Sequence, residues 1–144
     1  MLDIQAVNHV GIRVADKGVS IAFYELLGFE LLSDVGFEKG HPVIMKHGSG
    51  VVINLLGPAT TDLGSNILMD VDEKHAGITH VALTVASLAA SKEFLTASSI
   101  EITGFFSFGE MSAVFIRDPD RNVIELDAYG LAGEDEMDDY SAHP

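Results

Sequence analysis

The sequence predicts an α+β fold built from two copies of a β-α-β-β-β unit. The first observation is a repeat, because the segment around His9 returns around His80, 71 positions later. Asn54 and Glu125, near the ends of the two copies, are separated by the same offset. The second observation is that each copy has one helix-like segment followed by several strand-like segments. An offset that is kept through both kinds of segment indicates a duplicated structural unit.

The segments that open the two copies have the alternation of half-buried strands. In the range 6–14, His9 falls on one face, and valine and isoleucine side chains fall on the other. In the range 78–85, His80 falls on a face of small or polar side chains, and the opposite face is apolar. Each histidine is therefore expected to point away from the packed core.

The remaining elements follow in the same order in both copies. Asp16 is a candidate N-cap of the first helix, whose apolar residues have helical spacing, and Gly28 is placed to end it. A weaker apolar stripe predicts the second helix at 88–97. The other strands are expected near 29–35, 42–47, 51–56, 101–105, 112–117 and 122–127.

These elements predict a first module at 1–56 and a second at 78–130. The range 57–77 has no clear periodicity, so we expect a linker or a binding loop there. The range 131–144 is rich in acidic residues and is expected to form a solvated tail. Each module is expected to be a curved sheet with a helix on its outer side, which leaves a concave face opposite the helix.

Composition narrows the classes of function. The net charge of −14 argues against nucleic acids and anionic membranes as partners, because both require a basic patch. No apolar run is long enough to span a membrane, and the N-terminus lacks the basic region of a secretory signal. The sequence has no cysteine, which excludes disulfides and thiolate chemistry. We therefore expect a soluble, cytoplasmic protein.

Several short motifs are shared with one known family. They are Asn8-His9-Val10, Phe23-Tyr24, Leu27-Gly28-Phe29, Thr79-His80-Val81-Ala82, Asp118-Pro119-Asp120 and Val123-Ile124-Glu125-Leu126. Over about residues 6–129, the chain resembles the vicinal-oxygen-chelate superfamily, which contains glyoxalase I, extradiol dioxygenases and bleomycin-resistance proteins. The resemblance implies curved mixed sheets around a concave metal-site cavity, with the helices outside.

In metal-dependent members of that superfamily, the ligands come from the first and last strands of the modules. The resemblance therefore implies His9, His80 and Glu125 as ligands of one divalent ion, with open positions for water or two substrate oxygens. Zinc, nickel, cobalt, manganese and iron all suit such a set. A lone histidine on a strand is more often a hydrogen-bonded core residue. Two repeat-related histidines and a glutamate on one face favour the metal site.

Two further positions are compared with glyoxalase I. Asn54 stands where that enzyme has a fourth ligand, a carboxylate that also moves the proton, and a neutral amide is a poorer ligand. Arg13 matches an arginine that holds a substrate carboxylate. The alternative for Arg13 is a structural ion pair with Glu125 or Asp127. Glu125, Asn54 and Arg13 are accordingly the candidate catalytic residues.

The predicted function is that of a divalent-metal-dependent, glyoxalase-like enzyme of the lyase or isomerase type. It would act on a small substrate chelated through adjacent oxygens, and the metal would stabilise an enolate-like intermediate. One alternative is a non-catalytic small-molecule-binding protein of the bleomycin-resistance type. Another is a ring-cleaving dioxygenase, which is less favoured because Phe115 and the Ser65 region stand where dioxygenases have their Tyr and acid–base His.

The resemblance to short members of the superfamily also implies a homodimer. In that arrangement His9 and the His80–Glu125 pair of one site come from different subunits. The alternative is that the two modules of one chain pair with each other.

Overall fold

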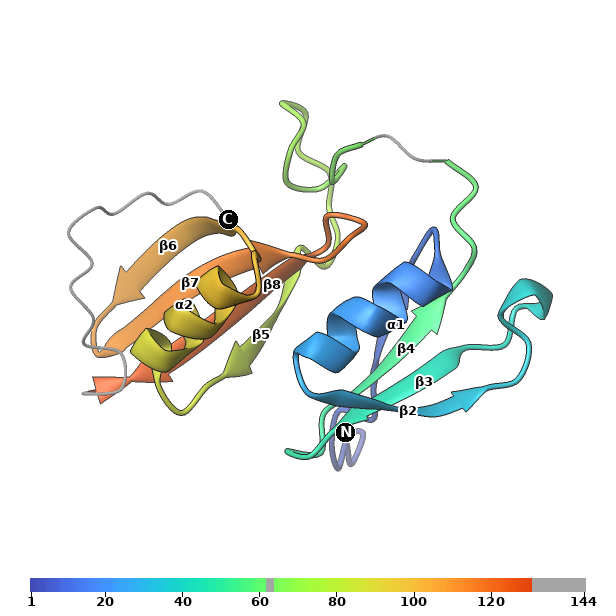
Figure 1. Cartoon of the computed structure of the whole chain (residues 1–144), viewed down its shortest axis with the longest axis horizontal. Coiled ribbons are helices and arrows are strands. Elements are labelled where there is room, and N and C mark those ends of the chain that lie inside the picture. Colours follow the sequence, from blue (N-terminus) through green and yellow to red (C-terminus); the bar gives the residue numbers. More distant parts are fainter. Residues whose placement is uncertain (62–63, 131–144) are drawn as a thin grey trace. The chain divides into compact units, whose positions relative to one another are not determined.

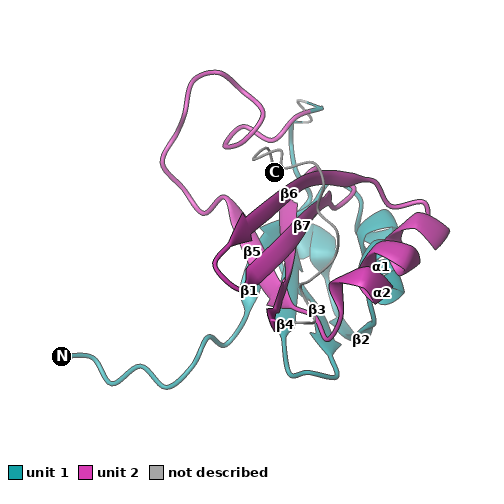
Figure 2. Cartoon of the chain, turned by 90° about the vertical axis from the view of Figure 1, so that its left-hand side faces the viewer, with its two compact units in different colours: residues 1–64 teal, residues 65–144 magenta. Residues whose placement is uncertain are grey.

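The computed structural model describes residues 1–61 and 64–130 (Figure 1). The predicted acidic tail, 131–144, lies outside the described residues. The chain forms two compact units, Met1–Gly64 and Ser65–Pro144, which Figure 2 colours separately. Each unit contains one α-helix and one four-stranded mixed sheet, which confirms the predicted α+β class with two repeated β-α-β-β-β modules.

The first unit has the strand order β1-β4-β3-β2. The first strand pairs in parallel with β4, and the other neighbouring strands are antiparallel. Its elements are β1 (Val10–Arg13), α1 (Lys17–Leu26), β2 (Phe29–Asp34), the short 3-10 helix η1 (Phe37–Lys39), β3 (Val43–His47) and β4 (Val52–Leu56).

The second unit has the equivalent order β5-β8-β7-β6, again with one parallel pair, β5 and β8. Its elements are β5 (His80–Thr84), α2 (Leu88–Ala97), β6 (Ile102–Phe108), β7 (Met111–Arg117) and β8 (Val123–Tyr129). Within residues 1–61 and 64–130, neither α-helix is long and apolar enough to cross a membrane.

The repeat extends to details of the backbone. Asp16 and Ser87 cap the two helices, and each side chain accepts a hydrogen bond from the backbone N–H three residues further on, at 3.0 and 3.2 Å. Strands β2 and β6 each contain a register shift against the neighbouring strand. One residue at each shift has no partner in the pairing, Leu32 in β2 and Thr103 in β6. Both pairs of positions have the 71-residue offset of the sequence repeat. The duplication therefore includes helix starts and strand irregularities.

Each helix lies across one face of its sheet (Figure 1). Apolar side chains of alternate strand positions are buried on that side and form the core of the unit. In the first unit the buried strand residues include Ile12, Val43, Met45, Ile53 and Leu55, and in the second Val114, Ile116, Ile124 and Leu126. The opposite face of each sheet carries the polar residues that were singled out from the sequence.

Several strands differ in length from their predicted ranges, among them β1 and β6. The strand expected at 6–14 is shorter, because β1 is an edge strand and its pairing with β4 begins at Val10 and Ile53. His9 therefore lies just before the strand. The strand expected at 101–105 is longer, because a two-residue turn at Gly109 and Glu110 lets β6 and β7 pair as far as Phe108.

A charged cluster fixes part of the segment before β5 to the second sheet. Asp70 accepts hydrogen bonds from Arg117 at 2.8 Å, from Arg121 at 3.2 Å and from the backbone N–H of Asn66. Burial alone would raise the pKa of Asp70, but the Asn66 N–H and the two guanidinium groups outweigh it and hold the pKa below its ordinary value of 3.8.

Asp70→Asn is expected to lower the free energy of unfolding at pH 7 by about 1–3 kcal/mol, because the charged hydrogen bonds are lost. A carboxyl group with a lowered pKa stabilises the fold above its ordinary value of 3.8, and this contribution is lost as the pH falls through the folded-state pKa. Urea unfolding of both proteins between pH 7 and pH 3 measures this. The exposed Asp72→Asn is the control, and a constant difference at all pH values would contradict the assignment.

Candidate functional site

The parallel pairing of β5 with β8 brings His80 and Glu125 together. Glu125 is in register with Ala82, two positions beyond His80, so the histidine and the glutamate are diagonal neighbours on one face. The His80 Nε2 atom lies 3.0 Å from Glu125 Oε2. A nitrogen and an oxygen that both bind transition metals are therefore adjacent on the face opposite α2.

Two neighbours orient the His80 ring. The Thr79 hydroxyl lies 2.8 Å from Nδ1, the nitrogen that does not face Glu125. The ring of Phe115 packs edge-on against the imidazole, with the ring centres 6.2 Å apart. A hydroxyl group accepts or donates a hydrogen bond, so Thr79 is compatible with either tautomer of the histidine. The Nε2 atom is thereby directed toward the carboxylate.

The Glu125 carboxylate is buried, with 8% of the residue exposed. Burial raises its pKa above the ordinary value of 4.5. The His80 imidazole acts in the opposite direction, and the neighbouring Asp127 carboxylate adds to the increase. A carboxylate held in such surroundings is stabilised by a bound cation, which is one property of a ligand-binding site.

In the first unit, Asn54 occupies the position that Glu125 has in the second. It pairs in register with Gly11 of β1 and Ile44 of β3. Its Oδ1 atom is buried and accepts no hydrogen bond from the described residues. Burying an acceptor in this state costs free energy.

The other two predicted residues of the first unit are exposed. His9 precedes β1, and its Nδ1 atom lies 2.7 Å from the Asn8 Oδ1 atom. Arg13 ends β1 on the same face, and no ion pair joins it to a carboxylate within the described part of its own unit. Its alternative partners, Glu125 and Asp127, belong to the second unit, and that pairing stays a prediction.

The structure thus joins two of the three proposed ligands, His80 and Glu125, within one unit. His9 belongs to the other unit, so the complete set of three remains a prediction. Within the described ranges, no group of three histidine, aspartate or glutamate side chains is close enough to hold a metal ion.

Two residues next to this pair were not assigned a role in ligand binding from the sequence. Thr79 was part of a motif, but strand alternation does not predict the contact of its hydroxyl with the His80 ring. Asp127 follows Glu125 on the same face of β8, is 7% exposed, and has a buried Oδ1 atom without a partner. Strand alternation places Asp127 on this face, but alternation alone does not reveal whether a carboxylate is paired.

The family model named Glyoxalase/Bleomycin resistance protein/Dioxygenase superfamily matches residues 6–126 of the chain. The chain belongs to this superfamily. It includes enzymes as well as non-catalytic binding proteins, and its members commonly use a divalent metal. No curated protein matches the sequence.

Solved structures share the fold at low sequence identity. A glyoxalase family protein from Enterococcus faecalis has a TM-score of 0.69 at 24% identity, covering 88% of this chain and 100% of that one. Lactoylglutathione lyase from Agrobacterium tumefaciens has a TM-score of 0.64 at 20% identity, covering 88% of this chain and 95% of that one. TnmS3, an antibiotic binding protein from Streptomyces sp. CB03234, has a TM-score of 0.68 at 21% identity, covering 90% of this chain and 100% of that one.

Glu125→Gln is expected to raise the free energy of unfolding of the chelator-treated protein at pH 7, because it removes a buried negative charge. A carboxyl group with a raised pKa binds its proton more tightly in the folded state. Stability is therefore highest below the ordinary value of 4.5 and is lost as the pH rises through the folded-state pKa. Glutamine keeps an acceptor for His80 and carries no charge.

Urea unfolding of wild type and variant from pH 4 to pH 8 measures the effect, and the advantage of the variant should disappear near pH 4. Glu93→Gln, at an exposed helix position, is the control. A variant less stable than wild type at pH 7 would show that the charge of Glu125 supports the fold.

Proposed function

We propose that this protein is a divalent-metal-dependent, glyoxalase-like enzyme that acts on a small substrate through two adjacent oxygens. The observation that carries the proposal is the contact between His80 and Glu125 on the face of the second sheet opposite the helix. His9 is the proposed third ligand. The protein is further proposed to be a cytoplasmic homodimer in which His9 comes from the partner copy.

The donor atoms in the second unit fit a metal ion. Two ligand atoms that each lie about 2.1 Å from one ion, at a right angle, are about 3.0 Å apart. The observed distance between His80 Nε2 and Glu125 Oε2 is 3.0 Å. To bind, the imidazole must present its Nε2 lone pair and carry its proton on Nδ1. The Thr79 hydroxyl, 2.8 Å from Nδ1, is placed to accept a hydrogen bond from that proton.

When bound, a divalent ion supplies Lewis-acid stabilisation of an oxyanion. The remaining contributions come from the side chains of the chain itself. The burial of Glu125 keeps water from competing for its oxygens. Asn54 is proposed to line the cavity without a tight bond to the metal. Arg13 is proposed to bind a substrate carboxylate.

The second candidate function is that of a non-catalytic small-molecule-binding protein. It is favoured by Asn54, because the carboxylate that moves a proton in glyoxalase I has been replaced there by a neutral amide. TnmS3, described as an antibiotic binding protein, has a similar fold, and binding without catalysis would need only the shape and polarity of the face. Metal dependence separates the two functions.

The purified protein is expected to bind about one divalent ion per chain, and His80→Ala should weaken the affinity on the order of a hundredfold. The reason is that the variant removes one ligand and leaves the buried Glu125 without its partner. Elemental analysis and calorimetric titration with Zn²⁺, Ni²⁺, Co²⁺ and Mn²⁺ measure the effect.

The control for this experiment is His75→Ala, which removes an exposed histidine of the same unit. Its metal content should equal that of wild type. Equal metal content in wild type and His80→Ala would contradict the proposed site and favour the non-catalytic binding protein.

Asn54→Glu is expected to increase the metal affinity about tenfold, because it places a carboxylate where Asn54 now presents only an amide oxygen. Asn54→Gln has the same side-chain length without the charge and is the matched control. Calorimetry measures the affinities of the three proteins. An Asn54 oxygen at bonding distance in a metal-bound crystal structure of the wild type would show that four ligands are already present.

A further inference from the structure

The carboxylate of Asp127 lies on the same face as His80 and Glu125, which we call the site face. In the sheet register, Asp127 stands between Thr84 of β5 and Ala113 of β7. Two residues of a strand span about 7 Å, so Asp127 is that far along β8 from Glu125. The proposed function uses His80 and Glu125 and assigns nothing to Asp127.

Asp127 is buried without a hydrogen-bond partner on one of its oxygens. The residue is 7% exposed, and its Oδ1 atom is inaccessible to solvent and accepts no hydrogen bond from residues 1–61 or 64–130. An unpaired polar group in this position costs about 1–3 kcal/mol, and an unpaired charge costs more. Such a cost is most readily retained when a bound molecule supplies a compensating positive charge.

Among the described residues of the neighbouring strands, no side chain is paired with Asp127 as a positive charge. Ala113 contributes only a methyl group, and the Thr84 hydroxyl makes no hydrogen bond to the carboxylate within the described residues. The cation of β7 on this face, Arg117, is four residues from Ala113 and binds Asp70 at 2.8 Å. The second carboxylate, Glu125, increases the negative charge near Asp127.

The site face also provides space and apolar surface beside Asp127. Ala82 and Thr84 are small and exposed on the edge strand β5. Tyr129, the next residue on this face of β8, is 58% exposed and stands opposite Met111. The combination of an unpaired carboxylate, small side chains and an exposed aromatic ring suits an organic cation better than an anion.

We propose that Asp127 is a ligand-binding residue and that it recognises a protonated amine attached to an apolar or aromatic group. The ammonium group pairs with the Asp127 carboxylate, and the apolar part lies against Tyr129 and Met111. This inference rests on the proposed function in placing the ligand on the site face. It adds the chemical class of the ligand, and it does not require a metal ion.

Three probes that differ only in the polar group test the recognition: 2-phenylethylamine, 2-phenylethanol and 3-phenylpropionate. Calorimetry at pH 7 with chelator-treated protein is expected to show the amine binding at least about tenfold more tightly than the alcohol, since a charged pair adds to the hydrogen bond. The carboxylate is expected to bind most weakly. Asp127→Asn should reduce amine binding to the level of the alcohol.

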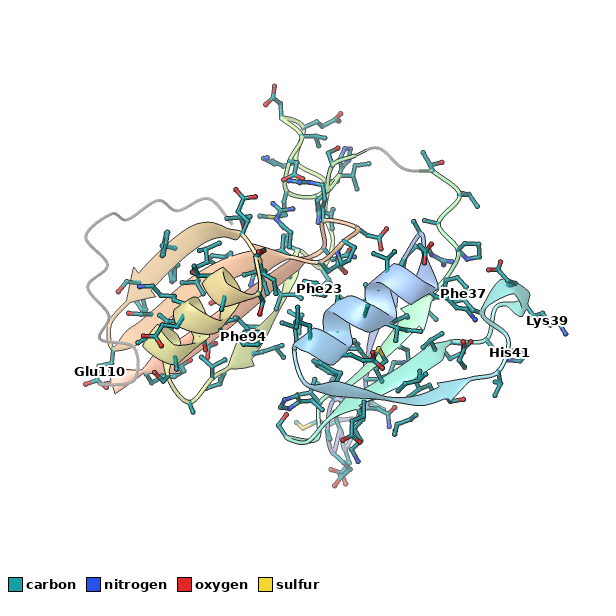
Figure 3. The ribbon with its side chains drawn as sticks, viewed as in Figure 1. Phe23, Phe37, Lys39, His41, Phe94 and Glu110 are labelled. Carbon is teal, nitrogen blue, oxygen red and sulfur yellow. The ribbon has the colours of Figure 1, made fainter. Side chains whose placement is uncertain are left out.

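The negative charge of the whole chain would attract any amine weakly, so the control must remove one carboxylate elsewhere. Glu93→Gln does this at an exposed position of α2, next to Phe94, which Figure 3 labels. Its amine affinity should stay within about twofold of wild type. An equal loss of affinity in Glu93→Gln and Asp127→Asn would assign the effect to net charge and overturn the proposal.

The melting temperature provides a second measurement. A structural role of Asp127 predicts the opposite change in it from a ligand-binding role. If the carboxylate is kept for a ligand, Asp127→Asn should increase the melting temperature of the ligand-free protein. A lower melting temperature, or a variant that does not fold, would show that Asp127 supports the fold, and would overturn the proposal. An amine that fails to bind wild type, or binds no better than the alcohol, would also overturn it.

Repeating the amine titration with His80→Ala separates this inference from the proposed function. Amine preference that persists in a variant without metal affinity supports the role of Asp127 independently of the metal. Loss of metal binding in all proteins together with intact amine preference would refute only the metal-dependent enzyme. Intact metal binding without amine preference would refute only the inference about Asp127.

Discussion

The parallel pairing of the first strand with the last strand is the constraint on which each unit depends. Parallel neighbours cannot be joined by a tight turn, so the helix and two further strands must lie between them in the chain. In the second module the pairing places His80 of the first strand beside Glu125 of the last strand. In the first module the same pairing positions Asn54 but begins only at Val10 and Ile53, so His9 lies just before the paired strand.

The two units have used the same backbone positions differently. In the second unit, Glu125 and Asp127 bury two carboxylates in one strand, at a cost in stability. The neighbouring strand β7 offsets this cost, because its residues Val114 and Ile116 are fully buried on the opposite face. In the first unit the equivalent residue is the neutral Asn54, so the acidic chemistry of the duplicated fold is concentrated in one copy. A binding site of this kind is expected to lower the stability of the fold.

Much of this arrangement could be predicted from the sequence because it depends on periodicity. The repeat defined the two modules, and strand alternation placed Asn54 and Glu125 on the faces opposite the helices. The ends of the strands depend on their partners, so the late start of β1 could not be seen in its own residues. The role of Asp70 could not be predicted either, because contacts between a loop and distant guanidinium groups follow no period. His9 lies in a different module from Glu125, and alternation carries no information about distances between modules.

The charges of the site face set requirements that a substrate must meet together. A divalent ion bound by His80 and Glu125 would offset the charge of one carboxylate and leave Asp127 facing the ligand. Substrate oxygens would then belong at the Glu125 end of β8, and a positive group would belong about 7 Å further along the strand. An anionic group at that second position would meet Asp127 without any neighbouring cation to compensate. A ligand of the second sheet therefore fits this distribution of charge when its oxygens lie beside Glu125 and its positive group lies beside Asp127.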